Sequence, residues 1–242
     1  INHVPVASIG TLGIKYNNKI IKTNLTSPDT ITLHKTLNFL KNKKIDNVII
    51  ESSSHGLEQN RLHHIDFKGA IFTNFSQDHL DYHKTMRTYL NAKLILFRKI
   101  LKKNSSIISD IEIDQFTSLK KIAKKRSLKI FDISNVIKNI RLTNLTLYSD
   151  FKIKNLAMAF QAVKLCGLKD SLIYKSIKKI KDVSGRLELI RKFHNEIKVY
   201  IDYAHTPDAL LKTLKFLRSN YGNNVSLVFG CGGERDKKKR PL

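Results

Sequence analysis

The sequence predicts an α/β fold with parallel strands, and three observations indicate it. Short apolar runs, such as the one at 47–50, alternate with stretches whose apolar residues are spaced as one face of a helix. Two predicted strands, ending at Ile50 and Phe72, run directly into clusters of polar side chains. A glycine-rich turn follows the run at 225–229. Ligands of open α/β sheets bind outside the carboxyl ends of strands, so we expect a site beyond Ile50 and Phe72.

The first third of the chain contains two predicted strands and one helix. Residues 4–9 form an apolar run that ends at Gly-Thr-Leu-Gly, which predicts a strand. Pro28 and Asp29 are typical helix starts, and the apolar spacing after them predicts a helix to about Leu40. Thr26 and Ser27 just before it could serve simply as helix caps. A second strand is predicted at 47–50.

A stretch at 72–97 organises the predicted site. It follows a buried strand at 70–72 and turns polar at once, before a helix predicted from about Thr85 to Leu101. Lys93 falls on the apolar stripe of that helix, where a lysine should snorkel, be paired, or be chemically used. Taken alone, Lys93 would be read as snorkelling and His79 as a loop or capping residue. The carboxylate, serines and histidine that follow the strand at 47–50 favour a functional role for Lys93 and His79.

The remaining elements follow from the same apolar patterns. Strands are expected at 106–109, 128–131, 141–147, 198–202 and 225–229. Helices are expected at 115–126, 155–166 and 171–180, and one begins after Pro207. The order strand, helix, strand, glycine-rich turn at the end predicts the beginning of a second nucleotide-fold-like domain.

The composition bounds the function classes. A chain of 242 residues can form one large or two modest domains, and its formal net charge is +24. Such a charge suits a nucleic-acid or anionic-surface partner. The lysine clusters at 41–44, 120–126 and 175–181 are instead interpreted as solvated helix faces, because no DNA-binding motif accompanies them. Anionic substrates would also benefit from a positive field.

The sequence shows no signal peptide and no apolar run of membrane-spanning length. Cys166 and Cys231 lie in unrelated contexts without metal-ligand spacing, which fits a reducing, cytoplasmic setting. The chain begins at Ile1 and ends inside a motif, so we expect a fragment of a protein that is longer at both ends.

Several motifs together resemble the Mur ligase family, within it the enzymes that add the third residue of the peptidoglycan stem peptide. The motifs are ESSSHGLEQNR at 51–61, FTNFSQDHLDYH at 72–83, NAKLILF at 91–97, SGRLE at 184–188, DYAHTPD at 202–208 and GCGGERDKKKRP at 230–241. The resemblance implies a P-loop-type central domain at 1–183, a junction at 184–196, and the start of a Rossmann-like C-terminal domain at 197–242. No G-x-x-x-x-G-K-[ST] phosphate loop occurs in the sequence, although the family requires one.

The resemblance also implies an activity and its participants. It implies an amide ligase of peptidoglycan biosynthesis in which ATP converts a carboxylate into an acyl phosphate that an amino acid then attacks. The expected cofactors are ATP and Mg²⁺, and the expected substrates are UDP-N-acetylmuramoyl-L-alanyl-D-glutamate and an amino acid. The glycine-rich turn at 230–241 favours meso-diaminopimelate over L-lysine. A monomer with no nucleic-acid or membrane partner is expected, and the fragment alone is expected to be inactive.

By the same resemblance, specific residues receive roles. Carbamylated Lys93, Glu51 and His79 are the implied catalytic residues and metal ligands. The residues implied to bind the UDP-sugar are Thr26, Ser27, Ser53, Gln59 and Arg61. The residues implied to bind ATP are Asn155, Arg186 and Asp202, and Arg235 is implied in the amino-acid pocket. The chain departs from the family pattern at Lys152, where an asparagine near the adenine is usual.

Three alternatives remain at this stage. The first is a different Mur-like amide ligase of the folylpolyglutamate synthase type, against which the motifs at 51–61 and 230–241 argue. The second is a basic nucleic-acid-binding protein, motivated only by the charge. The third is a non-catalytic remnant, motivated by the missing phosphate loop.

Overall fold

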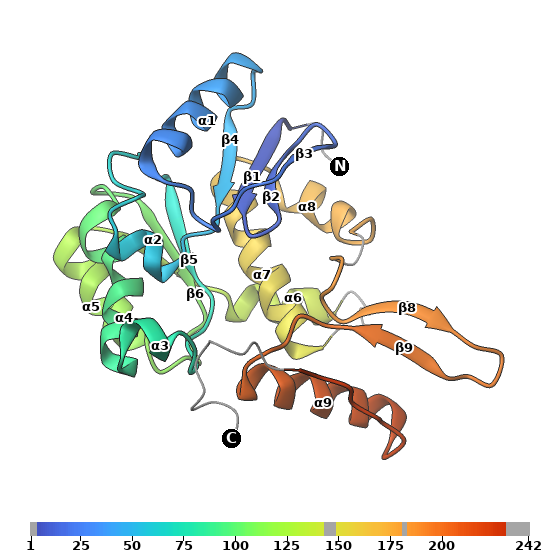
Figure 1. The fold of residues 1–242 in the computed structure, drawn as a ribbon. Helices are drawn as coiled ribbons and strands as arrows, with labels where there is room; N and C mark the ends of the chain where they lie inside the picture. Colours follow the sequence, from blue (N-terminus) through green and yellow to red (C-terminus); the bar gives the residue numbers. More distant parts are fainter. Residues whose placement is uncertain (1–3, 143–148, 181–182, 231–242) are drawn as a thin grey trace.

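The structure is a computed structural model that describes residues 4–142, 149–180 and 183–230. Its larger part is an α/β body with two sheets, and its smaller part is a β-hairpin beside one long helix (Figure 1). Within these described ranges, no helix is both long enough and apolar enough to cross a bilayer. The predicted α/β class with parallel strands is confirmed.

The first sheet has the strand order β3-β2-β1-β4. β1 (Val6–Gly10) pairs parallel with β4 (Asn47–Ile50) and antiparallel with β2 (Gly13–Tyr16), which in turn pairs with β3 (Lys19–Ile21). Gly13 has a φ of +86°, and a Cβ there would lie 2.4 Å from a carbonyl oxygen of β3. A glycine is therefore needed where β2 begins.

The second sheet is parallel throughout, in the order β5-β6-β7. Its strands are β5 (Gly69–Phe72), β6 (Ser106–Ser109) and β7 (Lys129–Asp132). Parallel neighbours need crossover connections, and helical segments supply them between β5 and β6 and between β6 and β7. All four residues of β6 are buried, as expected for the central strand of a parallel sheet covered on both faces.

Helices cover the two sheets and connect their strands. Their bounds are α1 (Thr30–Asn42), α2 (Ser54–Glu58), α3 (Leu80–His83), α4 (Met86–Ile95), the π-helical turn η1 (Leu96–Ile100), α5 (Phe116–Arg126), α6 (Ser134–Arg141), α7 (Asp150–Leu165) and α8 (Asp170–Ile177). The cap of α1 is Asp29, whose side chain accepts a hydrogen bond from the Thr32 backbone at 2.9 Å. The alternative that Thr26 or Ser27 caps this helix is therefore wrong.

Two hydrophobic clusters hold the larger part together. One joins the first sheet to α1, α2 and η1, and includes Leu33, Leu57 and Phe97. The other packs α6, α7 and α8 against the second sheet, around Ile133 and Phe160. Complete burial of one such side chain contributes about 1.5–3 kcal/mol, so these clusters carry most of the stability.

The smaller part consists of β8 (Glu188–Lys192), β9 (Lys198–Ile201) and α9 (Pro207–Tyr221). Thr206 caps α9 by accepting from the Ala209 backbone, and the helix starts with proline. The hydroxyls of Tyr200 and Tyr221 lie 2.6 Å apart and tie the end of α9 to the hairpin.

Some predicted elements differ from the structure. The predicted strand at 225–229 is not a strand, because no described strand lies beside it to share backbone hydrogen bonds, and Val228 is 99% exposed. The predicted strand at 141–147 is wrong at its start, where Arg141 ends α6, and its residues 143–147 lie outside the described ranges. The helix predicted at 155–166 begins five residues earlier, at Asp150, where Ser149 caps it.

Candidate active site

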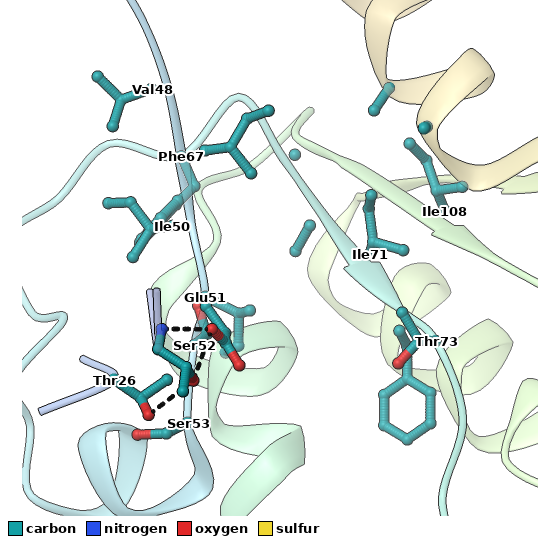
Figure 2. A pocket seen from close by; sticks show the side chains of 18 of the residues that line it. Thr26, Val48, Ile50, Glu51, Ser52, Ser53, Phe67, Ile71, Thr73 and Ile108 are labelled. Atoms are coloured by element: carbon teal, nitrogen blue, oxygen red, sulfur yellow. Dashed lines mark hydrogen bonds between the residues drawn. The ribbon is translucent and has the colours of Figure 1, made fainter. Parts of the chain in front are cut away.

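The carboxyl ends of β4 and β5 open onto a cavity of about 1720 Å³. Figure 2 shows Glu51 just beyond β4 and Thr73 just beyond β5, with Thr26 and Ser53 beside Glu51. This cavity therefore lies where the sequence predicted a site, outside the ends of these two strands.

Glu51 is held by the turn that follows β1. Its Oε2 accepts hydrogen bonds from the Thr11 backbone at 2.8 Å and from the Thr11 hydroxyl at 3.0 Å. A Cβ at Gly10 would lie 2.5 Å from this same oxygen, so only glycine lets the turn approach the carboxylate. The carboxylate is thus fixed in place before any ligand binds.

Five residues with an implied sugar-nucleotide role gather at the start of α2. The Arg61 guanidinium donates to the Ser27 carbonyl at 2.9 Å and to the side-chain oxygen of Gln59. Thr26 shares a hydrogen bond of 3.1 Å with Thr11, and Ser53 caps α2. Residues from separate segments of the chain therefore meet near Glu51, and their contact with a sugar nucleotide stays a prediction.

Ser27 is buried and its hydroxyl is engaged twice. The hydroxyl donates to the Glu51 carbonyl at 2.8 Å and accepts from the Ser53 backbone at 2.9 Å. These bonds join the loop before α1 to the end of β4. Ser27 shapes this corner of the site through those bonds, and its contact with a substrate stays a prediction.

His79 occupies a left-handed backbone conformation at the start of α3, with φ 57° and ψ 25°. This conformation is uncommon for a residue with a side chain and occurs often at functional sites. Asp78 stabilises it by accepting from the His79 backbone at 3.0 Å, and its second oxygen lies 3.5 Å from His79 Nε2. Burial lowers the pKa of His79, against the opposing effect of Asp78, so the ring is neutral at pH 7.

A buried network of polar groups lies beneath His79. His83 is buried, its Nε2 lies 2.9 Å from the Ser54 hydroxyl, and its Nδ1 lies 3.6 Å from a Glu58 oxygen. Its ring stacks on Tyr89, with centroids 5.2 Å apart. Burial lowers the pKa of His83 and raises the pKa of Tyr89 to about 12, so both groups are uncharged at neutral pH. The network connects α2, α3 and α4.

Lys93 extends from α4 toward the same cavity. Its Nζ lies 5.1 Å from the centre of the Tyr89 ring. Burial of the ammonium group lowers the pKa of Lys93, while the nearby carboxylates of Asp78 and Glu51 partly restore the charged form. The amine is therefore desolvated and within electrostatic range of both carboxylates, which argues against a side chain that snorkels to solvent.

The donor atoms around Glu51 and Lys93 do not by themselves suit a magnesium ion. Across the part of the chain that the structure describes, no three histidine, cysteine or carboxylate side chains cluster as a metal site. Mg²⁺ prefers oxygen donors in octahedral geometry, and an unmodified lysine would repel it. The encoded side chains therefore do not form a complete site, and a carboxylate-like group on Lys93 would be needed beside Glu51.

The residues with an implied ATP role are spread over two parts of the structure. Asn155 lies on the exposed face of α7, and Lys152, one turn earlier, donates to the Leu187 carbonyl at 3.4 Å. Asp202 follows β9 and accepts from the Thr213 hydroxyl at 2.7 Å. Arg186 lies over the Tyr203 ring at 4.6 Å and lines the large cavity. The structure thus places Arg186 at the cavity of the candidate site. Asp202 is instead hydrogen-bonded to α9.

Two site residues were missed by sequence reasoning, and one lies outside the described ranges. Thr11 was missed, although it sits in a glycine turn directly after a strand, which is a usable signal. Asp78 was seen only as one of several polar residues, and its link to His205 crosses 127 positions. Arg235 falls in 231–242, outside the described residues.

Comparison with known families gives two matches that cover most of the chain. The family described as Mur ligase middle domain matches residues 2–167. The family described as Mur ligase, glutamate ligase domain matches residues 185–242.

Similar curated proteins carry one name, UDP-N-acetylmuramoyl-L-alanyl-D-glutamate--2,6-diaminopimelate ligase. The protein of that name from Wigglesworthia glossinidia brevipalpis is 36% identical, with 97% of this chain and 52% of that protein covered. The one from Rhizobium meliloti (strain 1021) is 32% identical, with 98% of this chain and 53% of that protein covered. The chain therefore spans about half the length of these curated relatives.

Solved structures give a consistent picture. A ligase structure with the same name has a TM-score of 0.71 at 29% identity, covering 98% of this chain and 53% of that one. A Mycobacterium tuberculosis folylpolyglutamate synthase has a TM-score of 0.62 at 13% identity, covering 91% of this chain and 61% of that one, a likeness of fold alone.

Proposed function

Because the chain belongs to the Mur ligase family, we propose that it is part of an ATP-dependent ligase of peptidoglycan synthesis. The proposed reaction joins meso-diaminopimelate to UDP-N-acetylmuramoyl-L-alanyl-D-glutamate, releasing ADP and phosphate. The relatives named for this reaction support the choice of substrates. In this proposal residues 1–183 are the central domain, 184–196 the junction and 197–242 the start of the C-terminal domain.

The observation that carries the proposal is that Glu51, directly beyond β4, and Lys93, on α4, line the same cavity. Burial lowers the pKa of Lys93, and the charges of Asp78 and Glu51 act on it in the opposite direction. The lysine ammonium first releases a proton, and the neutral amine then attacks CO₂, forming a C–N bond and releasing a second proton to give an anionic carbamate with two oxygen donors. A buried lysine with a lowered pKa is chemically suited to that change, and the new anion beside Glu51 would complete a metal site.

The proposed metal ligands are carbamylated Lys93, Glu51 and His79, and the proposed ion is Mg²⁺. When bound, magnesium supplies positive charge that offsets the negative charge of the phosphoryl group in transfer. The protein groups around it have separate tasks. Thr11 fixes the Glu51 carboxylate, and Asp78 fixes the backbone turn and the ring of His79.

We assign the corner beside α2 to the UDP-sugar substrate. Arg61 presents a guanidinium, which can form paired hydrogen bonds to a diphosphate or carboxylate. Gln59 holds that guanidinium from one side, and the Ser27 carbonyl holds it from another. The side chains of Thr26 and Ser53 line the same cavity. The net charge of +24 favours the approach of such an anionic substrate.

We assign ATP to the face formed by Asn155, Arg186 and Asp202, and the amino acid to the segment that contains Arg235. Arg186 lies in the proposed junction and Asp202 beyond it, whereas Asn155 lies on α7, so this assignment requires both parts of the molecule. A cytoplasmic, monomeric enzyme completes the proposal, because ATP and nucleotide-activated sugars are cytoplasmic substrates.

The test is a ligation assay on the full-length protein. Purified enzyme is incubated with ATP, Mg²⁺, UDP-N-acetylmuramoyl-L-alanyl-D-glutamate and diaminopimelate, and the nucleotide-linked product is identified by mass spectrometry. We expect one ADP and one phosphate per amide formed, and no product without the amino acid. Ligation of glutamate to a folate substrate, with no activity on the UDP-linked substrate, would refute the proposal in favour of the folylpolyglutamate synthase type.

A further inference from the structure

His55 lies at the meeting point of several aromatic rings, and the proposed reaction assigns it no task. It belongs to the first turn of α2 and lines the same cavity as Glu51 and Lys93. The centre of its ring lies 4.1 Å from that of Tyr82 and 5.2 Å from that of His79. The planes of the His55 and His79 rings are perpendicular, so an edge of one ring meets a face of the other. These ring contacts fix the orientation of the imidazole of His55.

The ring nitrogens of His55 have no partner among the residues that the structure describes. No described side chain or backbone group shares a hydrogen bond with either nitrogen, and neither of them is sealed from solvent. The neighbouring His83 differs, because one of its nitrogens lies 2.9 Å from the Ser54 hydroxyl and the other 3.6 Å from a Glu58 oxygen. A ring that is held in one orientation, with accessible nitrogens that the protein does not use, is preorganised for a ligand.

His55 connects the two corners of the candidate site. Tyr82 links it to the sugar-nucleotide corner, because the Tyr82 hydroxyl accepts a hydrogen bond from Gln59 at 3.2 Å and Gln59 holds the guanidinium of Arg61. The ring contact with His79 links it to the proposed metal corner. A chain of contacts therefore runs from Arg61 through Tyr82 and His55 to His79. A substrate that spans both corners has to pass His55.

The surroundings of His55 keep its ring uncharged. Burial has the largest effect and lowers the pKa of His55, and the charge of Arg61 acts in the same direction. The carboxylates of Asp81, Glu58 and Asp78 oppose this effect without reversing it. A neutral imidazole offers one N–H donor and one acceptor. The donor is therefore available to an acceptor group of a bound ligand, and the positive charge of Arg61 favours an anionic one.

The part of the substrate that reaches His55 follows from the proposed function, on which this inference rests. UDP-N-acetylmuramoyl-L-alanyl-D-glutamate ends in a glutamate with two free carboxylates, and only one of them reacts. The reacting carboxylate belongs at the metal corner, where Lys93 and Glu51 line the cavity. The other carboxylate is joined to it by a short carbon chain, so it lies near the same corner and needs a hydrogen-bond donor. His55, which is in ring contact with His79, lies within that reach.

We propose that His55 donates a hydrogen bond to the non-reacting carboxylate of the glutamate and thereby presents the other carboxylate to Lys93 and Glu51. The glutamate is then held at two points, which fixes the orientation that the reaction needs. Tyr82 has a supporting task, because its ring packs on His55 while its hydroxyl is held by Gln59. His55 is thus a substrate-binding residue that selects which carboxylate reacts.

The test compares two nucleotide ligands of the full-length enzyme by isothermal titration calorimetry without ATP. One ligand is UDP-N-acetylmuramoyl-L-alanyl-D-glutamate, and in the other the non-reacting carboxylate is replaced by a carboxamide. A hydrogen bond to a charged acceptor is stronger than one to a neutral acceptor, so the unaltered enzyme should bind the carboxamide at least about fivefold more weakly. His55→Phe keeps an aromatic ring but lacks the donor, so its Kd values for the two ligands should agree within about twofold. His55→Asn keeps an N–H donor and should retain part of the discrimination.

The matched control is His194→Phe, an exposed histidine in the turn between β8 and β9, which should discriminate between the ligands as the unaltered enzyme does. Discrimination in His55→Phe equal to that of the unaltered enzyme would overturn the proposal, as would an unaltered enzyme that binds both ligands alike. If His55→Phe fails to fold, His55→Leu, which also lacks a donor, takes its place. An unaltered enzyme that binds and ligates the natural substrate, together with undiminished discrimination in His55→Phe, refutes this proposal alone. An unaltered enzyme that binds neither ligand refutes the proposed function as well.

Discussion

His205 Nε2 lies 3.3 Å from Asp78 Oδ2, and this contact joins the smaller part of the molecule to the candidate active site. The same oxygen of Asp78 lies 3.5 Å from His79 Nε2. The second nitrogen of His205 lies 2.9 Å from the Tyr203 carbonyl, which fixes the ring. A shift of the smaller part would therefore change the surroundings of His79 directly.

The first prediction concerns this contact. His205→Ala should loosen the attachment of the smaller part, with a cost of about 1 kcal/mol for the lost hydrogen bond. Limited proteolysis at residues 184–196 is expected to become several-fold faster. The matched control is His194→Ala, an exposed histidine in the turn between β8 and β9. Identical cleavage rates for the two variants would show that the contact does not restrain the junction.

The second prediction concerns Lys93 in the full-length enzyme. Lys93→Ala should reduce the ligation rate at least about 100-fold, because the anion proposed to hold magnesium is lost. The melting temperature should stay about the same, since an alanine fits the apolar stripe of α4 on which Lys93 lies. Lys99→Ala, an exposed lysine in η1, serves as the control and should retain activity.

Chemical rescue distinguishes a carbamate on Lys93 from an unmodified, positively charged lysine side chain. A short-chain carboxylate such as acetate should restore part of the activity to Lys93→Ala, where space is left, and none to Lys93→Met, where the side chain fills that space. Bicarbonate should restore neither. Wild-type activity in Lys93→Ala would remove Lys93 from the catalytic group.

The third prediction concerns an ion pair of the second sheet. Lys154 Nζ lies 2.7 Å from Asp110 Oδ2, and Asp110 is buried at the end of β6. Burial opposes the charge of Lys154, but the hydrogen bonds that Lys154 donates to Asp110 and Glu112 outweigh this effect and raise the pKa of Lys154. The stabilising contribution is therefore complete below the ordinary value of 10.5 and is lost as the pH rises through the raised pKa.

Removing one partner of this pair should cost more than removing both. Lys154→Ala leaves a buried carboxylate without its cation, and we expect a loss of about 3 kcal/mol in the free energy of unfolding at pH 7. Adding Asp110→Asn should recover part of that loss. Lys212→Ala, which breaks an exposed pair with Asp208, should cost under about 1 kcal/mol. Urea unfolding of Lys154→Ala, Asp110→Asn, the double variant and Lys212→Ala gives the comparison, and additive losses at positions 154 and 110 would contradict the coupling.

The fourth prediction concerns the network beneath His79. Ser54→Ala removes the hydroxyl that lies 2.9 Å from His83 Nε2 and leaves a buried ring nitrogen without that partner. The expected loss of unfolding free energy is about 1–3 kcal/mol. Ser118→Ala, an exposed serine in α5, should change stability by less than about 0.5 kcal/mol. Equal losses of unfolding free energy in Ser54→Ala and Ser118→Ala would mean that the hydrogen bond between Ser54 and His83 does not contribute to stability.

Much of the fold was predictable because apolar runs and helix starts are local signals. The strands at 47–50 and 106–109 agree residue by residue with β4 and β6. The β2–β3 hairpin was missed, although Asn17 and Asn18, both at positive φ, provide the turn that such a hairpin favours. The prediction of a strand at 225–229 was wrong, because the spacing of apolar residues does not reveal whether a neighbouring strand exists.

The site was predictable to the extent that its residues follow strands. Glu51 and the polar residues after β5 were placed correctly, because sheet topology brings strand ends together. The bond between Thr11 and Glu51 was not predictable, since it depends on the close approach allowed by Gly10. The contact between Asp78 and His205 depends on how two parts of the molecule pack, and no local pattern encodes that.

The last prediction concerns the amino acid that the full-length enzyme selects. Diaminopimelate carries a carboxylate at the far end of its side chain, and lysine does not. An arginine pairs with a carboxylate through two hydrogen bonds, which are stronger than neutral ones. In a competition assay with both amino acids we expect diaminopimelate to be incorporated preferentially. Arg235→Ala should raise the KM for diaminopimelate at least about tenfold, whereas Lys238→Ala, three positions along, should leave it unchanged. A preference for lysine would refute the selectivity, and an unchanged KM in Arg235→Ala would exclude Arg235 from the amino-acid pocket.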